Sequence, residues 1–201
     1  MKPAGALEWS EVAGGEAALV QRCVAGDERA SEELVLAHHR LVLSLATRLL
    51  GDREEALDLA QEVFLRVFRT LHSFRGQSSL RTWIFRIVVN QARNRQRWWR
   101  RRQRAAQVSL EEQIRANGEV ILGADTSTPE AACAAKELAA RLQGALQRLP
   151  FEQRTAVLLR EVDGLSYEEI AFSLGLAVGT VKSRLTRARQ ALRADLRDVK
   201  C

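Results

Sequence analysis

SYEEIAFSLGLAVGTVKSRLTRARQALR, residues 166–193, carries the local signals of two short helices joined by a tight turn. Ser166 and Glu169 have the spacing of a capping box at the start of the first helix. Gly175 supplies a turn that lets the second helix cross the first. The spacing as a whole is that of a helix-turn-helix, and it predicts an all-α domain at this end of the chain.

The second helix of this unit has one apolar and one basic face. Val181, Leu185, Ala188 and Leu192 share the inward side at helical spacing. Five basic residues and no acidic residue lie between Gly179 and Arg193. This pattern predicts a helix that reads the major groove of duplex DNA, the alternative being a basic hairpin that binds nothing. The residues predicted to face outward are Thr180, Lys182, Ser183, Thr186, Arg187 and Gln190.

A second helix with nucleic-acid chemistry is predicted at Leu80–Arg97, LRTWIFRIVVNQARNRQR. One side carries Leu80, Ile84, Ile87, Val88 and Gln91, and the opposite arc carries Arg86, Asn90, Arg93, Asn94 and Arg97, with Trp83 at its rim. No acidic residue occurs between Gly76 and Arg104. Arginines, amides and an aromatic ring on one face are typical of single-strand binding, although Trp83 also fits the edge of a core.

The residues before this helix form a short polar loop. Phe74 to Ser79 read FRGQSS, and Ser78 or Ser79 is a suitable N-cap for the helix that follows. Such a loop is able to receive a base that has been flipped out of a duplex.

Two further helices are predicted nearer the N-terminus, and Gly51-Asp52 separates them. Asp52 is expected to cap the second of these helices. We assign apolar stripes to Leu34, Leu41, Leu45 and Leu49 and to Leu57, Phe64, Phe68 and Leu71. The outward arc of the second helix holds a predicted Glu62–Arg66 pair, and its charges alone are typical of a solvated face. Its members are Glu55, Asp58, Glu62, Leu65, Arg66 and Arg69.

Charge along the chain divides it into domains. Residues 93–104 hold seven arginines and no acid, whereas residues 105–137 hold two basic and six acidic residues. Helical periodicity also ends at Ala105, where glycine, serine and threonine become frequent. We therefore predict an all-α chain of two small helical domains joined by a flexible linker. The predicted parts are an N-terminal extension (1–16), a first domain (17–104), the linker (105–130) and a helix-turn-helix domain (131–201).

Composition narrows the function further. The chain has 201 residues, a net charge of +6 and 46% apolar residues, which favours a nucleic-acid-binding protein with real cores. No apolar run reaches the roughly 18 residues that span a bilayer, and no signal core opens the chain. We expect a cytoplasmic protein without membrane insertion. The three cysteines, Cys23, Cys133 and Cys201, lack metal-ligand spacing and are interpreted as inert thiols rather than as redox sensors.

Catalytic chemistry is not expected. An enzyme acting on nucleic acid needs a carboxylate cluster for metal ions or a nucleophile beside a base. His38 and His39 point about 100° apart on a helix, and His72 is isolated, so no such site assembles. We predict no enzymatic activity, no catalytic residue, no metal site and no cofactor.

Three stretches of the chain resemble a known family. The stretches ALDLAQEVFLRVFRTLHSF, SSLRTWIFRIVVNQARN and LQRLPFEQRTAVLLREVDGLSYEEIAFSLGLAVGTVKSRLTRARQAL resemble bacterial extracytoplasmic-function (ECF) sigma factors of the sigma-E type, in the sigma-70 family. The resemblance covers residues 17–104 and 131–197 and includes the order of both halves. It implies an alternative sigma factor that directs core RNA polymerase to promoters.

The resemblance also implies roles for particular residues. Core polymerase, through its β′ clamp helices, is expected to contact Asp58, Gln61, Glu62 and Leu65. The −10 element is expected to be captured as single strand by Phe74, Arg75, Gly76, Gln77, Ser78, Ser79, Trp83, Arg86, Asn90, Asn94 and Arg97. The −35 element is expected to be read as duplex by Thr180, Lys182, Ser183, Arg184, Thr186, Arg187 and Gln190. Among the arginines, Arg184 and Arg189 are expected to contact the phosphate backbone of the DNA.

The implied partners are core RNA polymerase (β′ clamp helices and β flap), promoter DNA and an anti-sigma factor. The linker is expected to pass near the active-site and RNA-exit channels, and the chain to join the nucleoid when bound to polymerase. A stand-alone repressor or activator is the alternative, and it would need a dimerisation surface but no polymerase-docking helix.

Overall fold

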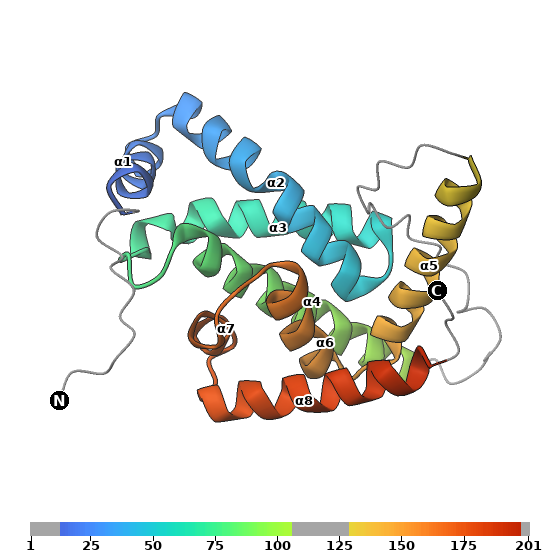
Figure 1. Cartoon of the computed structure of the whole chain (residues 1–201). Coiled ribbons are helices and arrows are strands. Elements are labelled where there is room, and N and C mark those ends of the chain that lie inside the picture. The colour runs from blue at the N-terminus through green and yellow to red at the C-terminus, as the bar shows by residue number, and fades with distance from the viewer. Residues whose placement is uncertain (1–12, 106–128, 198–201) are drawn as a thin grey trace.

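The computed structural model describes residues 13–105 and 129–197, and every regular element within these ranges is helical, as predicted (Figure 1). None of these helices is both long and apolar enough to cross a bilayer. The predicted linker lies almost entirely outside the described residues. In chain order the elements, including a 3₁₀ turn (η1) and a π-helical turn (η2), are α1 (Ala13–Val24), α2 (Glu28–Leu50), α3 (Arg53–Thr70), η1 (Leu71–Ser73), α4 (Leu80–Ala105), α5 (Pro129–Arg148), α6 (Phe151–Val157), η2 (Leu158–Val162), α7 (Tyr167–Leu174) and α8 (Val178–Asp195).

Helices α2, α3 and α4 pack on one another to form the core of the first domain. Local signals fix the junction between α2 and α3. Gly51 ends α2 with a left-handed φ of 78°, which favours glycine. The side chain of Asp52 then accepts a hydrogen bond from the Glu55 amide at 2.9 Å, so the predicted cap is confirmed.

The apolar stripe predicted for α3 is partly wrong. Leu57 and Phe68 are 40% and 36% exposed, whereas Phe64 and Leu71 are buried as expected. The buried face follows apolar residues at spacings of three and four, and it includes two alanines as well as larger side chains. Its members are Ala56, Leu59, Ala60, Val63, Phe64 and Val67.

The pair predicted within α3 is also wrong. Glu62 does not pair with Arg66; its carboxylate accepts a hydrogen bond from Arg95 of α4 at 2.7 Å. Arg95 also reaches the carboxylate of Glu55 at 2.7 Å. A half-buried arginine from the next helix can reach two carboxylates at once, which a lone i,i+4 pair on an exposed face does not offer.

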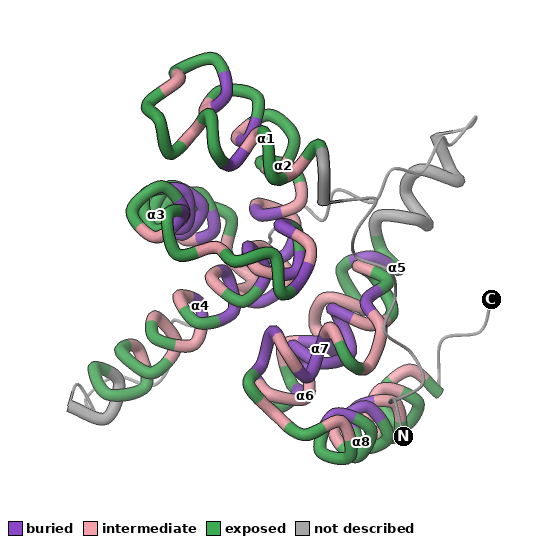
Figure 2. The backbone as a smooth tube through the Cα atoms, turned by 90° about the vertical axis from the view of Figure 1, so that its left-hand side faces the viewer, coloured by how far each residue is buried: buried purple, intermediate pink, exposed green. Residues whose placement is uncertain are grey.

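Helix α4 begins inside the first domain and extends away from it. The hydroxyl of Ser79 accepts a hydrogen bond from the Thr82 amide at 3.1 Å, as its predicted N-cap role requires. The side-chain carboxylate of Glu16 in α1 accepts a hydrogen bond from the Leu80 amide at 3.0 Å. Apolar side chains on the first half of α4 are buried, including Ile84, Phe85 and Val88. Figure 2 shows its second half projecting beyond the helices that cover its start.

The second domain contains the predicted helix-turn-helix. Ser166 and Glu169 form both hydrogen bonds of the capping box at the start of α7, at 3.1 and 2.8 Å. Gly175 ends α7 with a φ of 65°, and α8 then packs across α6 and α7. Val181, Leu185 and Ala188 are the buried residues of α8, in agreement with the predicted inward face.

The two domains pack directly against each other, which the sequence did not predict. Buried apolar residues of both domains belong to one continuous core. At the C-terminal end of α2, Gln147 donates to the Arg48 carbonyl at 3.0 Å and Arg154 donates to the Leu49 carbonyl at 2.8 Å. These donors satisfy carbonyls that a helix end leaves without partners. Burial lowers the pKa of Arg154 to about 10, and its position at a helix C-terminus favours the positive charge.

Candidate nucleic-acid interface

The outward face of α8 presents a row of polar and basic side chains to solvent. All six residues assigned to it from the wheel are exposed: Thr180, Lys182, Ser183, Thr186, Arg187 and Gln190. Arg184 differs from them, because it is half-buried and pairs with Glu152 of α6 at 2.6 Å. The predicted −35 residues therefore divide into an open face and one arginine held by an acid of its own domain.

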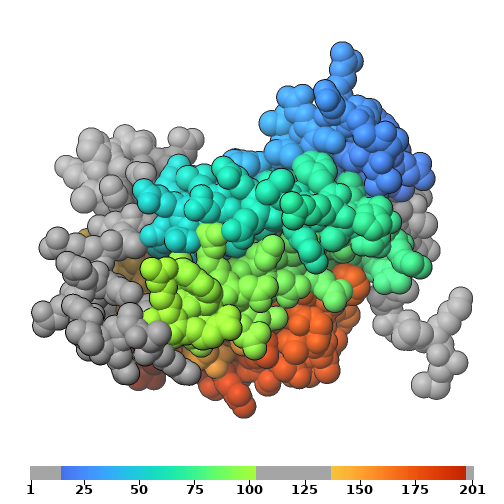
Figure 3. Space-filling view, turned by 180° about the vertical axis from the view of Figure 1, so that it is seen from behind, coloured from blue at the N-terminus to red at the C-terminus, as the bar shows by residue number. Residues whose placement is uncertain are grey.

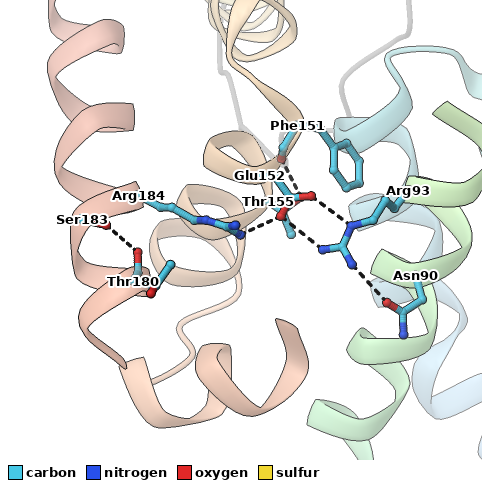
Figure 4. Close-up of polar contacts among 8 residues, drawn as sticks. All are labelled: Asn90, Arg93, Phe151, Glu152, Thr155, Thr180, Ser183 and Arg184. Atoms are coloured by element: carbon cyan, nitrogen blue, oxygen red, sulfur yellow. Dashed lines mark hydrogen bonds and ion pairs between the residues drawn. The ribbon is translucent and has the colours of Figure 1, made fainter. Parts of the chain in front are cut away.

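Two hydroxyls on this face are already engaged with their own helix. Ser183 donates to the Thr180 carbonyl at 2.9 Å, as Figure 4 shows, and Thr186 donates to the Lys182 carbonyl at 3.0 Å. Their lone pairs stay available as acceptors. Arg187, which follows Thr186 and lies one turn after Ser183, is also exposed.

The predicted stacking residues of the first domain lie together. The rings of Phe74 and Trp83 meet edge to face, with centroids 5.5 Å apart. Both side chains are half-buried and pack against the core, so Trp83 has the core-edge position that was the alternative reading. Half-buried aromatic rings can pack against a core and still offer surface to a base.

The loop before α4 is open at its centre. Arg75, Gly76 and Gln77 are exposed, and Gly76 has a left-handed φ of 65°. Ser78 is instead buried at 6% exposure, and its hydroxyl donates to the Ser79 carbonyl at 3.2 Å. Ser78 and Ser79 therefore shape the loop and the start of α4, and the three residues before them present its surface.

The arc predicted on α4 is only partly open. Asn90, Asn94 and Arg97 are exposed at intervals of one turn. Arg86 is also exposed, and its guanidinium lies over the ring of Phe172 in α7, 5.5 Å from the ring centroid. Arg93 is half-buried and points at the second domain.

Glu152 joins the two predicted DNA-reading helices, and no sequence pattern indicated it. Its carboxylate accepts hydrogen bonds from Arg93 of α4 at 3.0 and 3.2 Å and from Arg184 of α8 at 2.6 Å (Figure 4). Arg93 in turn lies 3.5 Å from the Asn90 side-chain oxygen. The only signal in the sequence is an acid near the start of a helix, which is common and carries no information about a partner 59 residues away.

The predicted polymerase-docking face of α3 is exposed. Asp58, Gln61, Glu62 and Leu65 are all open to solvent, and Leu65 is 57% exposed although it is apolar. Figure 3 shows α3 along the face of the molecule opposite to the one that Figure 1 presents, beside α4. The leucine gives this face an apolar side chain that a protein partner can bury.

His38, His39 and Cys23 take part in the packing of the first domain. Burial lowers the pKa of His38, and His39 stacks on Phe64 with ring centroids 6.4 Å apart. Burial also raises the pKa of Cys23, which makes that thiol less reactive. Among the residues that the structure describes, no three His, Cys, Asp or Glu side chains gather in a metal-binding group.

Asp163 carries a buried carboxyl at the domain contact. Burial raises its pKa from 3.8 to about 6, with Arg48 and Arg81 of the first domain acting in the opposite direction. Its Oδ2 atom is buried without a hydrogen-bond partner, while its backbone carbonyl accepts a hydrogen bond from Arg81 at 2.8 Å.

Replacing Asp163 by asparagine should stabilise the protein at pH 7.5 by up to about 3 kcal/mol. A raised pKa favours folding when the carboxyl is protonated, so the wild-type contribution is lost as the pH rises through about 6. The advantage of the variant should therefore disappear near pH 4. Urea unfolding at the two pH values measures it. Asp58→Asn removes an exposed carboxylate of α3 and is the control. An equal gain at both pH values would contradict the assignment.

Comparison with known proteins agrees with this arrangement. Residues 34–105 match the Sigma-70 region 2 family and residues 139–192 match Sigma-70, region 4. The RNA polymerase sigma-H factor of Pseudomonas aeruginosa is 41% identical over 174 residues, 87% of this chain and 90% of that protein. The ECF RNA polymerase sigma-E factor of Escherichia coli K12 is 38% identical over 175 residues, 87% of this chain and 90% of that protein.

Two solved structures have a similar fold. One is the sigma factor RpoE in complex with the anti-sigma factor NepR from Bartonella quintana, with a TM-score of 0.63 and 27% identity over 84% of this chain and 98% of that one. The other is CnrH in complex with the cytosolic domain of CnrY, with a TM-score of 0.65 and 26% identity over 92% of this chain and 99% of that one.

Proposed function

Because the chain belongs to the ECF sigma factors of the sigma-70 family, and is an alternative sigma factor for transcription initiation, we propose how its residues divide the work. Helix α8 reads the −35 element as duplex. The loop before α4, together with α4, captures the −10 element as single strand. The outward face of α3 docks on the clamp helices of core RNA polymerase.

The observation that carries this proposal is the open face of α8. Six polar or basic side chains on one face of α8, the second helix of the helix-turn-helix, are exposed. Side chains of this kind reach base edges and phosphates when such a helix enters the major groove. A stand-alone repressor would use the same face but is not favoured, because both sigma regions are present in order.

The first domain has different chemistry, suited to unpaired bases. Trp83 and Phe74 are partly exposed aromatic residues on which an unpaired base can stack. Asn90 and Asn94 carry amides that can make bidentate contacts with bases. Arg97 continues the same face and supplies charge for the phosphate backbone.

Energetics make the polymerase an obligatory partner. Opening about a dozen base pairs forfeits roughly 1.4 kcal/mol of stacking per step, on the order of 15 kcal/mol in total. Capturing two or three bases on aromatic side chains returns about 2–9 kcal/mol. The chain therefore nucleates an open bubble but needs the binding energy of the polymerase to hold it.

The proposal also includes the cellular compartment and the regulation of the chain. It acts in the cytoplasm on the polymerase, performs no chemistry of its own, and is restrained by an anti-sigma factor. Support for the last point comes from the two similar sigma factors, each of which was solved with an anti-sigma partner or the cytosolic domain of a second protein.

Gel filtration with purified core polymerase, followed by runoff transcription on a promoter library, tests the proposal. We expect the chain to co-elute with core and the transcribed templates to share one upstream and one downstream element. A homodimer that ignores core would support the repressor instead. Co-elution without a change in initiation sites would contradict the proposed reading of promoters.

A further inference from the structure

The second half of α4, which projects beyond the helices that cover its start (Figure 2), carries an aromatic side chain that the proposed function does not use. Trp98 is 49% exposed. The guanidinium of Arg102, one turn further along α4, lies over the Trp98 ring, 5.1 Å from the ring centroid. Tryptophan and arginine are among the residues that most often dominate the binding energy of a protein interface. This pair is therefore a candidate contact for a protein partner.

Trp98 and Arg102 continue the stripe of α4 that packs into the first domain. Spacings of four and three residues, the pattern by which helices pack on one another, keep the members of this stripe on one side of the helix. The members are Ile84, Val88, Gln91, Arg95, Trp98 and Arg102. The first two are fully buried, the middle two are half-buried and the last two are exposed. A helix-packing face thus extends from the core of the domain into solvent.

Arg95 connects this stripe with the proposed polymerase-docking face of α3. Its guanidinium donates hydrogen bonds to the carboxylates of Glu55 and Glu62, each at 2.7 Å, and Glu62 is a predicted contact of core polymerase. Trp98 lies one turn after Arg95 on α4, and Leu65 lies one turn after Glu62 on α3. An ion pair therefore links the two turns that carry the exposed apolar side chains. Figure 3 shows the second half of α4 beside α3 on one face of the molecule.

We propose that α4 shares the docking of core RNA polymerase with α3, and that Trp98, covered on one side by Arg102, is a second apolar anchor of that interface. The clamp helices expected to dock on α3 are themselves helical, so they suit a stripe with the spacing of a helix-packing face. The inference rests on the proposed docking of core polymerase on α3 and extends that docking to a second helix.

The stripe lies on a different side of α4 from the arc proposed to capture the −10 element. On a wheel at 100° per residue, the centre of the exposed positions Asn90, Asn94 and Arg97 lies roughly 70° from Trp98 and 110° from Arg102. The stripe turns toward α3, as the contacts of Arg95 show. Core polymerase on the stripe and promoter DNA on the arc can therefore be bound at the same time, which initiation requires.

Two variants of the full chain test the stripe by titration with core polymerase. Trp98→Ala should weaken core affinity about tenfold or more, because a large ring that the partner buries is lost. Arg102→Gln should weaken it about fivefold by removing the cation over that ring. Arg101→Gln removes the same charge at an adjacent exposed position outside the stripe, and Leu36→Ala removes exposed apolar surface on α2. Both controls should stay within about twofold of wild type.

Hydroxyl-radical labelling, read at single residues by mass spectrometry, locates the contact. In the free chain Trp98, Leu65 and Leu36 should all react, because each side chain is about half exposed or more. Core polymerase without DNA should protect Trp98 and Leu65 and leave Leu36 reactive. Because this measurement uses the wild-type chain, it does not depend on how any variant folds.

The inference would be overturned if Trp98→Ala bound core as tightly as the controls, or if Trp98 stayed reactive in the complex. Protection of Leu65 in either case would mean that docking on α3 still holds. Protection of Trp98 only after promoter DNA is added would assign this residue to nucleic acid and would also overturn the inference. If Leu65 and Trp98 both stayed reactive in the core complex, the proposed docking face on α3 would be wrong together with its extension.

Discussion

Replacing Leu65 by aspartate should lower the affinity of the chain for core RNA polymerase by about 30-fold or more. Leu65 is 57% exposed and makes no contribution to the core, so the fold should tolerate the change. In the complex, however, an apolar anchor would become a desolvated carboxylate, and losses of 2 kcal/mol or more are typical of such anchor positions. Titration of labelled protein with core polymerase measures the change directly.

Leu36→Asp is the matched control for that experiment. Leu36 is 72% exposed on α2 and lies outside the predicted docking face, so its replacement should leave core affinity within about twofold. Equal losses from both variants would mean that the docking face is not where we place it. Loss of helical signal in Leu65→Asp would point to a structural role instead.

Replacing Phe85 by alanine should destabilise the first domain by about 3–5 kcal/mol. Phe85 has no exposed surface and lies on the half of α4 that packs into the core. For a domain of this size, the melting temperature should fall by about 12 °C or more. Because α4 presents the proposed −10 residues, −10 recognition should fail at temperatures where −35 duplex binding persists.

Phe68→Ala provides the comparison in calorimetry. Phe68 is 36% exposed on α3, so its truncation should cost about 1 kcal/mol or less. If Phe68→Ala were as damaging as Phe85→Ala, the buried face of α3 would be the one first read from the sequence, and the described packing would be wrong.

The helix-turn-helix was predictable because its signals are local. A capping box, a left-handed glycine and a repeat of apolar residues each act within a few positions, so they set α7, Gly175 and α8 without knowledge of the rest. The same holds for the Asp52 cap and for the outward face of α8. Periodicity alone was sufficient wherever one helix presents one face to one core.

The predictions failed where residues far apart in the sequence decide the outcome. On α3 the pattern of large residues predicts Leu57 and Phe68 in the core, yet the buried face also uses Ala56 and Ala60, where α3 packs against its neighbours. Spacing within one helix predicts a Glu62–Arg66 pair, whereas Arg95 reaches Glu62 from α4.

No periodic pattern in the sequence indicates the contact between the domains. Glu152 and Arg93 are 59 positions apart, and Ser173 lies 91 positions from Thr82. Glu152, Ser173 and Thr82 resemble ordinary helix positions in the local sequence, and Arg93 belongs to the arc predicted to bind nucleic acid. Their pairing depends on how the domains dock, and a sequence motif does not predict that docking.

Promoter-library transcription by Asn90→Ala and Arg187→Ala, each assembled with core polymerase, tests the division of labour most directly. Asn90→Ala should weaken the base preference of the −10 element alone. Arg187→Ala should alter −35 selection or lower its affinity by roughly 1–3 kcal/mol. A uniform loss of activity in both variants, with the preferred sequences of both elements unchanged, would contradict the account.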